Sequence, residues 1–163
     1  MSRIVVIGVG NQNRRDDGVG PAVVRMLRRR ALPGVVLEES DGEPTRLLDL
    51  WGNASLAVVV DAVRAESPRP GRVHRRSLRH PSVRGIGKVS SHGMDLGDAV
   101  ALGEALDRLP AMLLLYAVEA ADTSFGEGLS PKVAAAADEL ADEIATELLH
   151  RGVPPNAGRN QVG

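Results

Sequence analysis

The stretch that decides the fold is Arg3-Ile-Val-Val-Ile-Gly-Val-Gly-Asn-Gln-Asn-Arg-Arg-Asp-Asp-Gly-Val-Gly20. Its first part, Ile4 to Val9, is apolar, rich in β-branched residues and almost continuous, which is typical of a strand buried on both faces. A polar segment, Asn11 to Asp17, follows. Beyond Gly18, apolar residues return at helical spacing, namely Val19, Val23, Met26 and Leu27. The stretch therefore predicts a buried strand, a polar loop and a helix that begins near Gly18.

The rest of the chain repeats this alternation of strand and helix patterns. We expect further strands at 35–39, 56–63, 73–78 and 111–118, and helices at 44–50, 94–109 and 131–150. The segment 73–78 alternates with Arg and His, so it is predicted to be an edge strand. Strands that alternate with helices form a mostly parallel sheet with right-handed crossovers. The prediction is an α/β three-layer sandwich, with a mixed, mostly parallel sheet of about five strands and helices on both faces.

Length and composition indicate one small globular domain. The chain has 163 residues, of which 43% are hydrophobic and 25% charged, as in ordinary globular proteins. We expect a single domain at 1–152 and a flexible C-terminal tail at 153–163, which is rich in proline and glycine. The absence of cysteine excludes thiol proteases, disulfide scaffolds and cysteine-ligated metal sites.

Charge and aromatic content argue against nucleic acid as a partner. The net charge is −1, with one Trp, one Tyr and one Phe, so the chain lacks the cationic surplus and the aromatic residues that nucleic-acid binding needs. The first apolar run is too short for the core of a signal peptide, and no run approaches the length that spans a bilayer. We expect a cytoplasmic protein that binds neither nucleic acid nor membranes.

Candidate functional residues follow the predicted strands. Ligands of open α/β sheets bind outside the carboxyl ends of the strands, and Asp16 and Asp17 come after the first strand. One of these two acids is expected to cap the following helix, which leaves the other as a ligand or general base. Asp61 interrupts an apolar strand, where an acid is costly unless it is paired, capped or bound to a metal. His92 is either a partly exposed loop histidine or a metal ligand beside the carboxylates.

Other polar residues have weaker claims to function. His74, His80 and His150 are expected at the surface, because no acidic cluster accompanies them in the sequence. Arg14 and Arg15 either receive a carboxylate group or are solvated at the surface. Gly8-Val-Gly10 is not a dinucleotide-binding motif, because Asn13 stands where that motif needs its third glycine. No phosphate-binding loop is present either, so no nucleotide cofactor is expected. No G-x-S-x-G motif of the serine hydrolases is present.

Several blocks of the sequence resemble one enzyme family. Gly8-Val-Gly-Asn11 followed by Asp16-Asp-Gly-Val-Gly20 resembles the opening of the [NiFe]-hydrogenase maturation endopeptidases. Val59-Val-Asp-Ala-Val63 is similar to the second acidic block of that family, and Ser90-Ser-His-Gly-Met-Asp-Leu96 to its histidine block. The segments 115–118 and 128–131 resemble its last strand and the entry to its last helix. The resemblance extends from about residue 4 to residue 149, essentially the whole predicted domain.

The resemblance implies an endopeptidase that removes the C-terminal extension of a [NiFe]-hydrogenase large-subunit precursor after nickel insertion. It implies that Asp17, Asp61 and His92 engage the nickel, which the precursor supplies. Asp16 is then a candidate general base. The loop Asp41-Gly42-Glu43 stands where many relatives carry a Gly-Gly pair, and we expect this loop to bind the substrate. The alternative is a non-catalytic metal-binding or hydrogenase-assembly chaperone module on the same fold, but the complete set of two acids and a histidine favours the protease.

Overall fold

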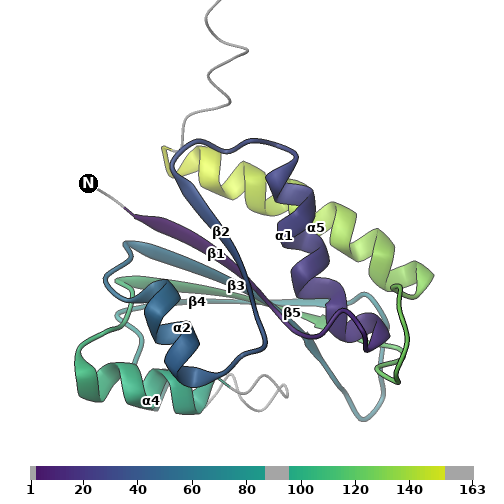
Figure 1. The fold of residues 1–163 in the computed structure, drawn as a ribbon, viewed down its shortest axis with the longest axis horizontal. Helices are drawn as coiled ribbons and strands as arrows, with labels where there is room; N and C mark the ends of the chain where they lie inside the picture. Colours follow the sequence, from purple (N-terminus) through teal and green to yellow (C-terminus); the bar gives the residue numbers. More distant parts are fainter. Residues whose placement is uncertain (1–2, 87–95, 153–163) are drawn as a thin grey trace, which may run out of the picture.

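The structure is a computed structural model that describes residues 3–86 and 96–152. Within them, five strands form one sheet in the order β2-β1-β3-β5-β4 (Figure 1). The strands are β1 (Ile4–Val9), β2 (Val35–Ser40), β3 (Leu56–Val63), β4 (Val73–Arg79) and β5 (Met112–Glu119). All neighbours pair in parallel except β4, which pairs antiparallel with β5 at one edge. The predicted mixed, mostly parallel sheet is confirmed.

Helices cover both faces of this sheet. On one face lie α1 (Val19–Arg28) and α5 (Pro131–His150), and on the other α2 (Pro44–Trp51) and α4 (Gly97–Leu106) (Figure 1). Each face has its own apolar core: Val6 of β1 packs toward α1 and α5, and Val5 and Ile7 pack toward α2 and α4. The strand is apolar throughout because both of its faces are buried. No helix among 3–86 and 96–152 has the length and apolar character needed to cross a bilayer.

The differences from the predicted elements have local causes. The polar segment after β1 contains a 3-10 helix, η1 (Arg15–Gly18), and a short α3 (Val83–Ile86) forms within a segment predicted as loop. Helix α4 ends three residues earlier than predicted because Asp107 adopts a left-handed conformation, with φ of 52°, which terminates a helix. Residues 87–95, with the predicted start of that helix, and the predicted tail at 153–163 lie outside the described residues.

Two glycines let α1 lie directly against the sheet. A Cβ atom added at Gly20 would lie 2.5 Å from the carbonyl oxygen of Val60 and 2.6 Å from that of Val9. A Cβ atom added at Gly8 would likewise collide with the carbonyl oxygen of Gly20. All of these atoms belong to backbone, which has little room to shift. The close approach fixes where α1 begins, and therefore where the η1 residues that precede it lie.

We predict that Gly20→Ala lowers the free energy of unfolding by about 2–3 kcal/mol, because the added methyl group overpacks the contact between helix and sheet. Urea unfolding followed by circular dichroism measures the change. Gly34→Ala is the control: nothing lies within 4 Å of its added Cβ, and φ is +79°, so only backbone strain of about 1 kcal/mol is expected. Equal losses in the two variants would contradict the prediction.

Candidate functional site

The candidate site lies where the carboxyl ends of β1 and β3 meet. β1 and β3 are neighbours in the sheet, but the chain leaves β1 for α1 on one face and reaches β3 from α2 on the other. Such a switch point opens a crevice at the carboxyl ends of the strands, where open α/β sheets bind ligands. Asp17 of η1 follows β1, and Asp61 lies near the end of β3. The structure therefore brings these two predicted residues to one crevice.

The surroundings of Asp61 disfavour its charge. Burial raises the pKa of Asp61 to about 7, and the nearby carboxylate of Asp17 adds to the rise. The N–H of Ala62, which donates to Asp61 Oδ1 at 2.8 Å, opposes the rise. Two carboxylates close together resist simultaneous ionisation unless a cation or a proton lies between them. Perturbation of this kind by burial and by a specific charged partner is common at functional sites.

In the described part of the chain, each of the two carboxylates has only one oxygen that accepts a hydrogen bond. Asp17 Oδ2 accepts the backbone N–H of Asn11 at 2.9 Å, and Asp61 Oδ1 accepts that of Ala62. The second oxygen of each accepts no hydrogen bond from residues 3–86 or 96–152. One oxygen therefore fixes the orientation of each side chain, and the other is available to a ligand. Carboxylate oxygens of this kind bind divalent cations.

Asp16, next to Asp17, has a different environment. It is fully buried, and its Oδ2 accepts the backbone N–H groups of Ala121 and Asp122 at 2.9 and 3.0 Å. Its Oδ1 accepts the N–H of Ser130 at 2.7 Å, and the Ser130 hydroxyl donates to Oδ2 at 2.9 Å. Burial alone would raise the pKa of Asp16, but these hydrogen bonds outweigh burial and lower it. A carboxylate with both oxygens occupied and a lowered pKa is poorly suited to take a proton, so the geometry favours a structural role over that of general base.

The predicted helix cap is wrong. Gly18 occupies the N-cap position of α1, and no side chain caps this helix. Asp16 instead bonds to the loop before α5, and Asp17 bonds to Asn11. The side chains of both acids are therefore engaged outside the helix that follows them.

The remaining predicted site residues are placed as follows. Asp41, Gly42 and Glu43 connect β2 to α2, where Glu43 caps α2 by accepting the N–H groups of Thr45 and Arg46, both at 3.1 Å. Their contact with substrate stays a prediction. His92 lies outside the described residues. Within the described part of the chain, no group of three His, Cys, Asp or Glu residues lies close enough to hold a metal ion.

His74, expected at the surface without an acidic neighbour, has one in the folded chain. It is partly buried on β4, and its Nε2 lies 2.7 Å from Oε2 of Glu119. Glu119 is buried at the end of β5, and its Oε1 accepts the backbone N–H of Arg69 at 2.9 Å. This pair joins the edge strand to its neighbour. The signal that could have revealed it is the acid that ends an otherwise apolar strand.

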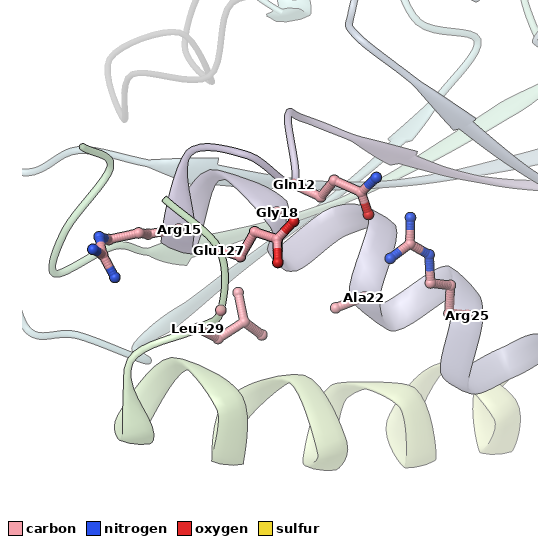
Figure 2. A pocket seen from close by; sticks show the side chains of 8 residues that line it. Gln12, Arg15, Gly18, Ala22, Arg25, Glu127 and Leu129 are labelled. Carbon is pink, nitrogen blue, oxygen red and sulfur yellow. The ribbon is translucent and has the colours of Figure 1, made fainter. Parts of the chain in front are cut away.

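Two of the pockets lined by the loop at 11–18 differ in whether they include a predicted site residue. The first, of about 310 Å³, lies between the start of α1 and the segment before α5, and Figure 2 shows the Glu127 side chain pointing into it. Gln12, Arg15 and Arg25 also line it, but none of the predicted site residues does. The second, also about 310 Å³, is lined by Arg14, Asp17, Ala62, Arg64 and Thr123. The second pocket therefore opens at the crevice.

Comparison with known proteins identifies the family. A family model described as hydrogenase maturation protease matches residues 21–147. The chain belongs to the hydrogenase maturation protease family. It is 27% identical over 155 residues to the hydrogenase 2 maturation protease of Escherichia coli strain K12, covering 93% of both chains. It is 31% identical over 134 residues to the hydrogenase expression/formation protein HupD of Thiocapsa roseopersicina, covering 80% of this chain and 60% of that one.

Solved structures agree with this family. The hydrogenase maturating endopeptidase HybD of Escherichia coli superposes with a TM-score of 0.77 at 25% identity, covering 92% of this chain and 94% of that one. The hydrogenase maturation protease HybD of Thermococcus kodakarensis superposes with a TM-score of 0.66 at 27% identity, covering 90% and 98%. The fold and the protease family expected from the sequence are both confirmed.

We predict that Asp16→Asn destabilises this maturation protease by roughly 2–3 kcal/mol at pH 7, because an amide NH₂ cannot accept the backbone N–H groups that the carboxylate accepts. The pKa of Asp16 is lowered on folding, so its contribution is present above the unfolded pKa and is lost as pH falls through the folded pKa. Urea unfolding of wild type and variant should therefore differ most near neutral pH and converge in acid. Unchanged stability at pH 7 would contradict the structural role.

Asp61→Asn should have the opposite effect on stability. The pKa of Asp61 is raised to about 7 in the folded chain, so the charged form of Asp61 opposes folding. The stability of the wild type therefore falls as pH rises from 4 to 7, and the loss of stability is complete above pH 7. The variant lacks this penalty, and we expect it to be more stable than wild type at pH 8 by on the order of a few kcal/mol. The difference should shrink toward pH 4. Thermal unfolding in the presence of a chelator measures it, and lower stability of the variant at both pH values would refute the prediction.

Proposed function

We propose that this maturation protease removes the C-terminal extension of a [NiFe]-hydrogenase large-subunit precursor after nickel has been inserted. The observation that carries the proposal is the pair of carboxylates at the crevice, Asp17 and Asp61, each with one oxygen that accepts no hydrogen bond from residues 3–86 or 96–152. Membership of the maturation protease family supports the same conclusion. The nickel belongs to the precursor and is therefore part of the substrate.

We assign Asp17, Asp61 and His92 to engage that nickel. Carboxylate oxygens and an imidazole nitrogen suit a borderline divalent ion. The pKa of Asp61 is raised chiefly by burial and further by the nearby Asp17, and a bound cation would stabilise its charged form against both. Nickel bound there would polarise the scissile carbonyl or lower the pKa of a bound water. Asp16 is a positioning residue in this scheme, because it holds the segment that carries Asp17 against the loop before α5.

The test is the intact mass of the hydrogenase large subunit from cells that lack this gene and are complemented with variants. Asp17→Asn, Asp61→Asn and His92→Ala should each leave the extension in place, with trimming reduced at least about 100-fold, because each removes a group expected to engage the metal. The purified Asp61→Asn variant is expected to be more stable than wild type, so its loss of trimming would not arise from unfolding.

His150→Ala serves as the matched control, because His150 is exposed at the end of α5, far along the chain from the crevice, and it should trim normally. Normal trimming by two of the three site variants would defeat the metal-site assignment. Complete trimming in the deletion strain would favour the chaperone alternative instead. In that case the variants should affect binding of the precursor rather than its cleavage.

A further inference from the structure

Two arginines from different loops converge beside the crevice. Arg14 lies in the loop after β1, and its Nε donates to the carbonyl oxygen of Thr123 at 3.2 Å. Arg64 directly follows β3, and its Nη2 donates to Oγ1 of the same threonine. Both arginines line the pocket of about 310 Å³ that also contains Asp17 and Ala62. The cationic groups therefore share a pocket with Asp17, one of the two carboxylates that we assign to the reaction.

The guanidinium groups keep most of their donors for a ligand. A guanidinium has five N–H donors, and Arg14 and Arg64 each use one of them on Thr123. Neither forms an ion pair with a carboxylate among residues 3–86 and 96–152, whereas the adjacent Arg15 pairs with Asp122 at 3.7 Å. No ion pair within 4.0 Å joins Arg14 or Arg64 to Asp17 or Asp61. The two arginines therefore do not neutralise those acids by direct contact.

The wall that carries Thr123 is held in place before any ligand arrives. Gly126 donates to the carbonyl of Asn13 at 2.8 Å and accepts the N–H of Arg15 at 2.9 Å, and Asp16 binds the start of the same loop. Phe125 on this loop is 85% exposed. Aromatic residues and arginine are both enriched at surfaces that bind another protein.

We propose that Arg14 and Arg64 bind a carboxylate in the C-terminal extension of the precursor, and so position the bond to be cut against Asp17 and Asp61. This inference rests on the proposed function. The planar fork of arginine matches a carboxylate with two parallel hydrogen bonds, and a polypeptide extension supplies carboxylates in its acidic side chains and at its terminus. An adjoining pocket of about 410 Å³, which shares Arg14, Arg64 and Thr123, extends away from Asp17 and provides a path for the extension.

The experiment measures trimming kinetics and precursor affinity with purified nickel-loaded precursor. Arg14→Gln and Arg64→Gln should each raise KM and Kd about tenfold, the effect of losing one charge-assisted hydrogen-bonded pair, with a smaller change in kcat. Arg64→Lys should recover only part of the loss, because lysine keeps the charge but not the fork. Arg29→Gln is the matched control: Arg29 is exposed at the end of α1, with no carboxylate partner among the described residues, and its KM should equal that of wild type.

Substrate variants identify the source of the carboxylate. If an acidic side chain is bound, one Glu→Gln or Asp→Asn change in the extension should raise KM as Arg64→Gln does, and the two changes together should add little. If the terminal carboxylate is bound, amidation of the terminus should have that effect. Restored trimming when Arg64→Glu is combined with an acid-to-arginine change in the extension would support direct contact.

An unchanged KM and Kd in the Arg14→Gln/Arg64→Gln double variant would overturn this inference. If the wild type trims the precursor in the same experiment, the proposed function stands. Binding without trimming by wild type would contradict the protease function, and the Kd values of the arginine variants would still decide whether the pocket holds a carboxylate. If wild type neither binds nor trims the precursor, both conclusions fall.

Discussion

The buried carboxylate of Asp16 joins the loop after β1 to the loop before α5, and the geometry of the candidate site depends on this junction. A charge removed from water is tolerated only when several donors surround it, and Asp16 has three backbone N–H groups and a hydroxyl. Its own N–H donates to the carbonyl of Asp122 at 3.0 Å, so the two loops are bonded in both directions. The loop after β1 carries Asp17 and Arg14, and the loop before α5 carries Thr123. One interaction thereby positions Asp17 and Arg14 relative to Thr123.

Burial acts to raise the pKa of both Asp16 and Asp61, but their net pKa shifts are opposite because their hydrogen-bond donors differ. Asp16 receives enough donors to keep its charge, whereas Asp61 receives one backbone N–H and faces the charge of Asp17. The first arrangement stabilises the fold, and the second opposes it at neutral pH. The proposed function would explain why the chain retains such an unfavourable charge at the crevice of its sheet, because active sites commonly trade stability for activity.

The contact between α1 and the sheet sets how far η1, with Asp17, lies from the ends of β1 and β3. Gly20 lies against the carbonyl oxygens of Val9 and Val60, so the first turn of α1 sits directly above the ends of β1 and β3. A side chain at Gly20 would push the helix and η1 away from the sheet. Asp17 would then move relative to Asp61, and the two carboxylates would no longer share one crevice.

The sequence by itself determined the strands and helices of the fold and marked Asp61 as a candidate site residue. Continuous apolar runs identify strands buried on both faces, the bounds of α5 agree with those predicted, and an acid within the apolar run of β3 marks Asp61 as costly unless it has a use. These features depend on neighbours within a few residues, which periodicity reports directly.

Only the tertiary structure decided which neighbouring acid is structural and which faces the crevice. Asp16 meets Ser130 across 114 positions of sequence, and His74 meets Glu119 across 45. Arg14 and Arg64 reach Thr123 across 109 and 59 positions. Such partners are brought together by strand order and loop closure rather than by local pattern, and a side chain's pKa and role follow from the donors and charges that the folded chain places around it.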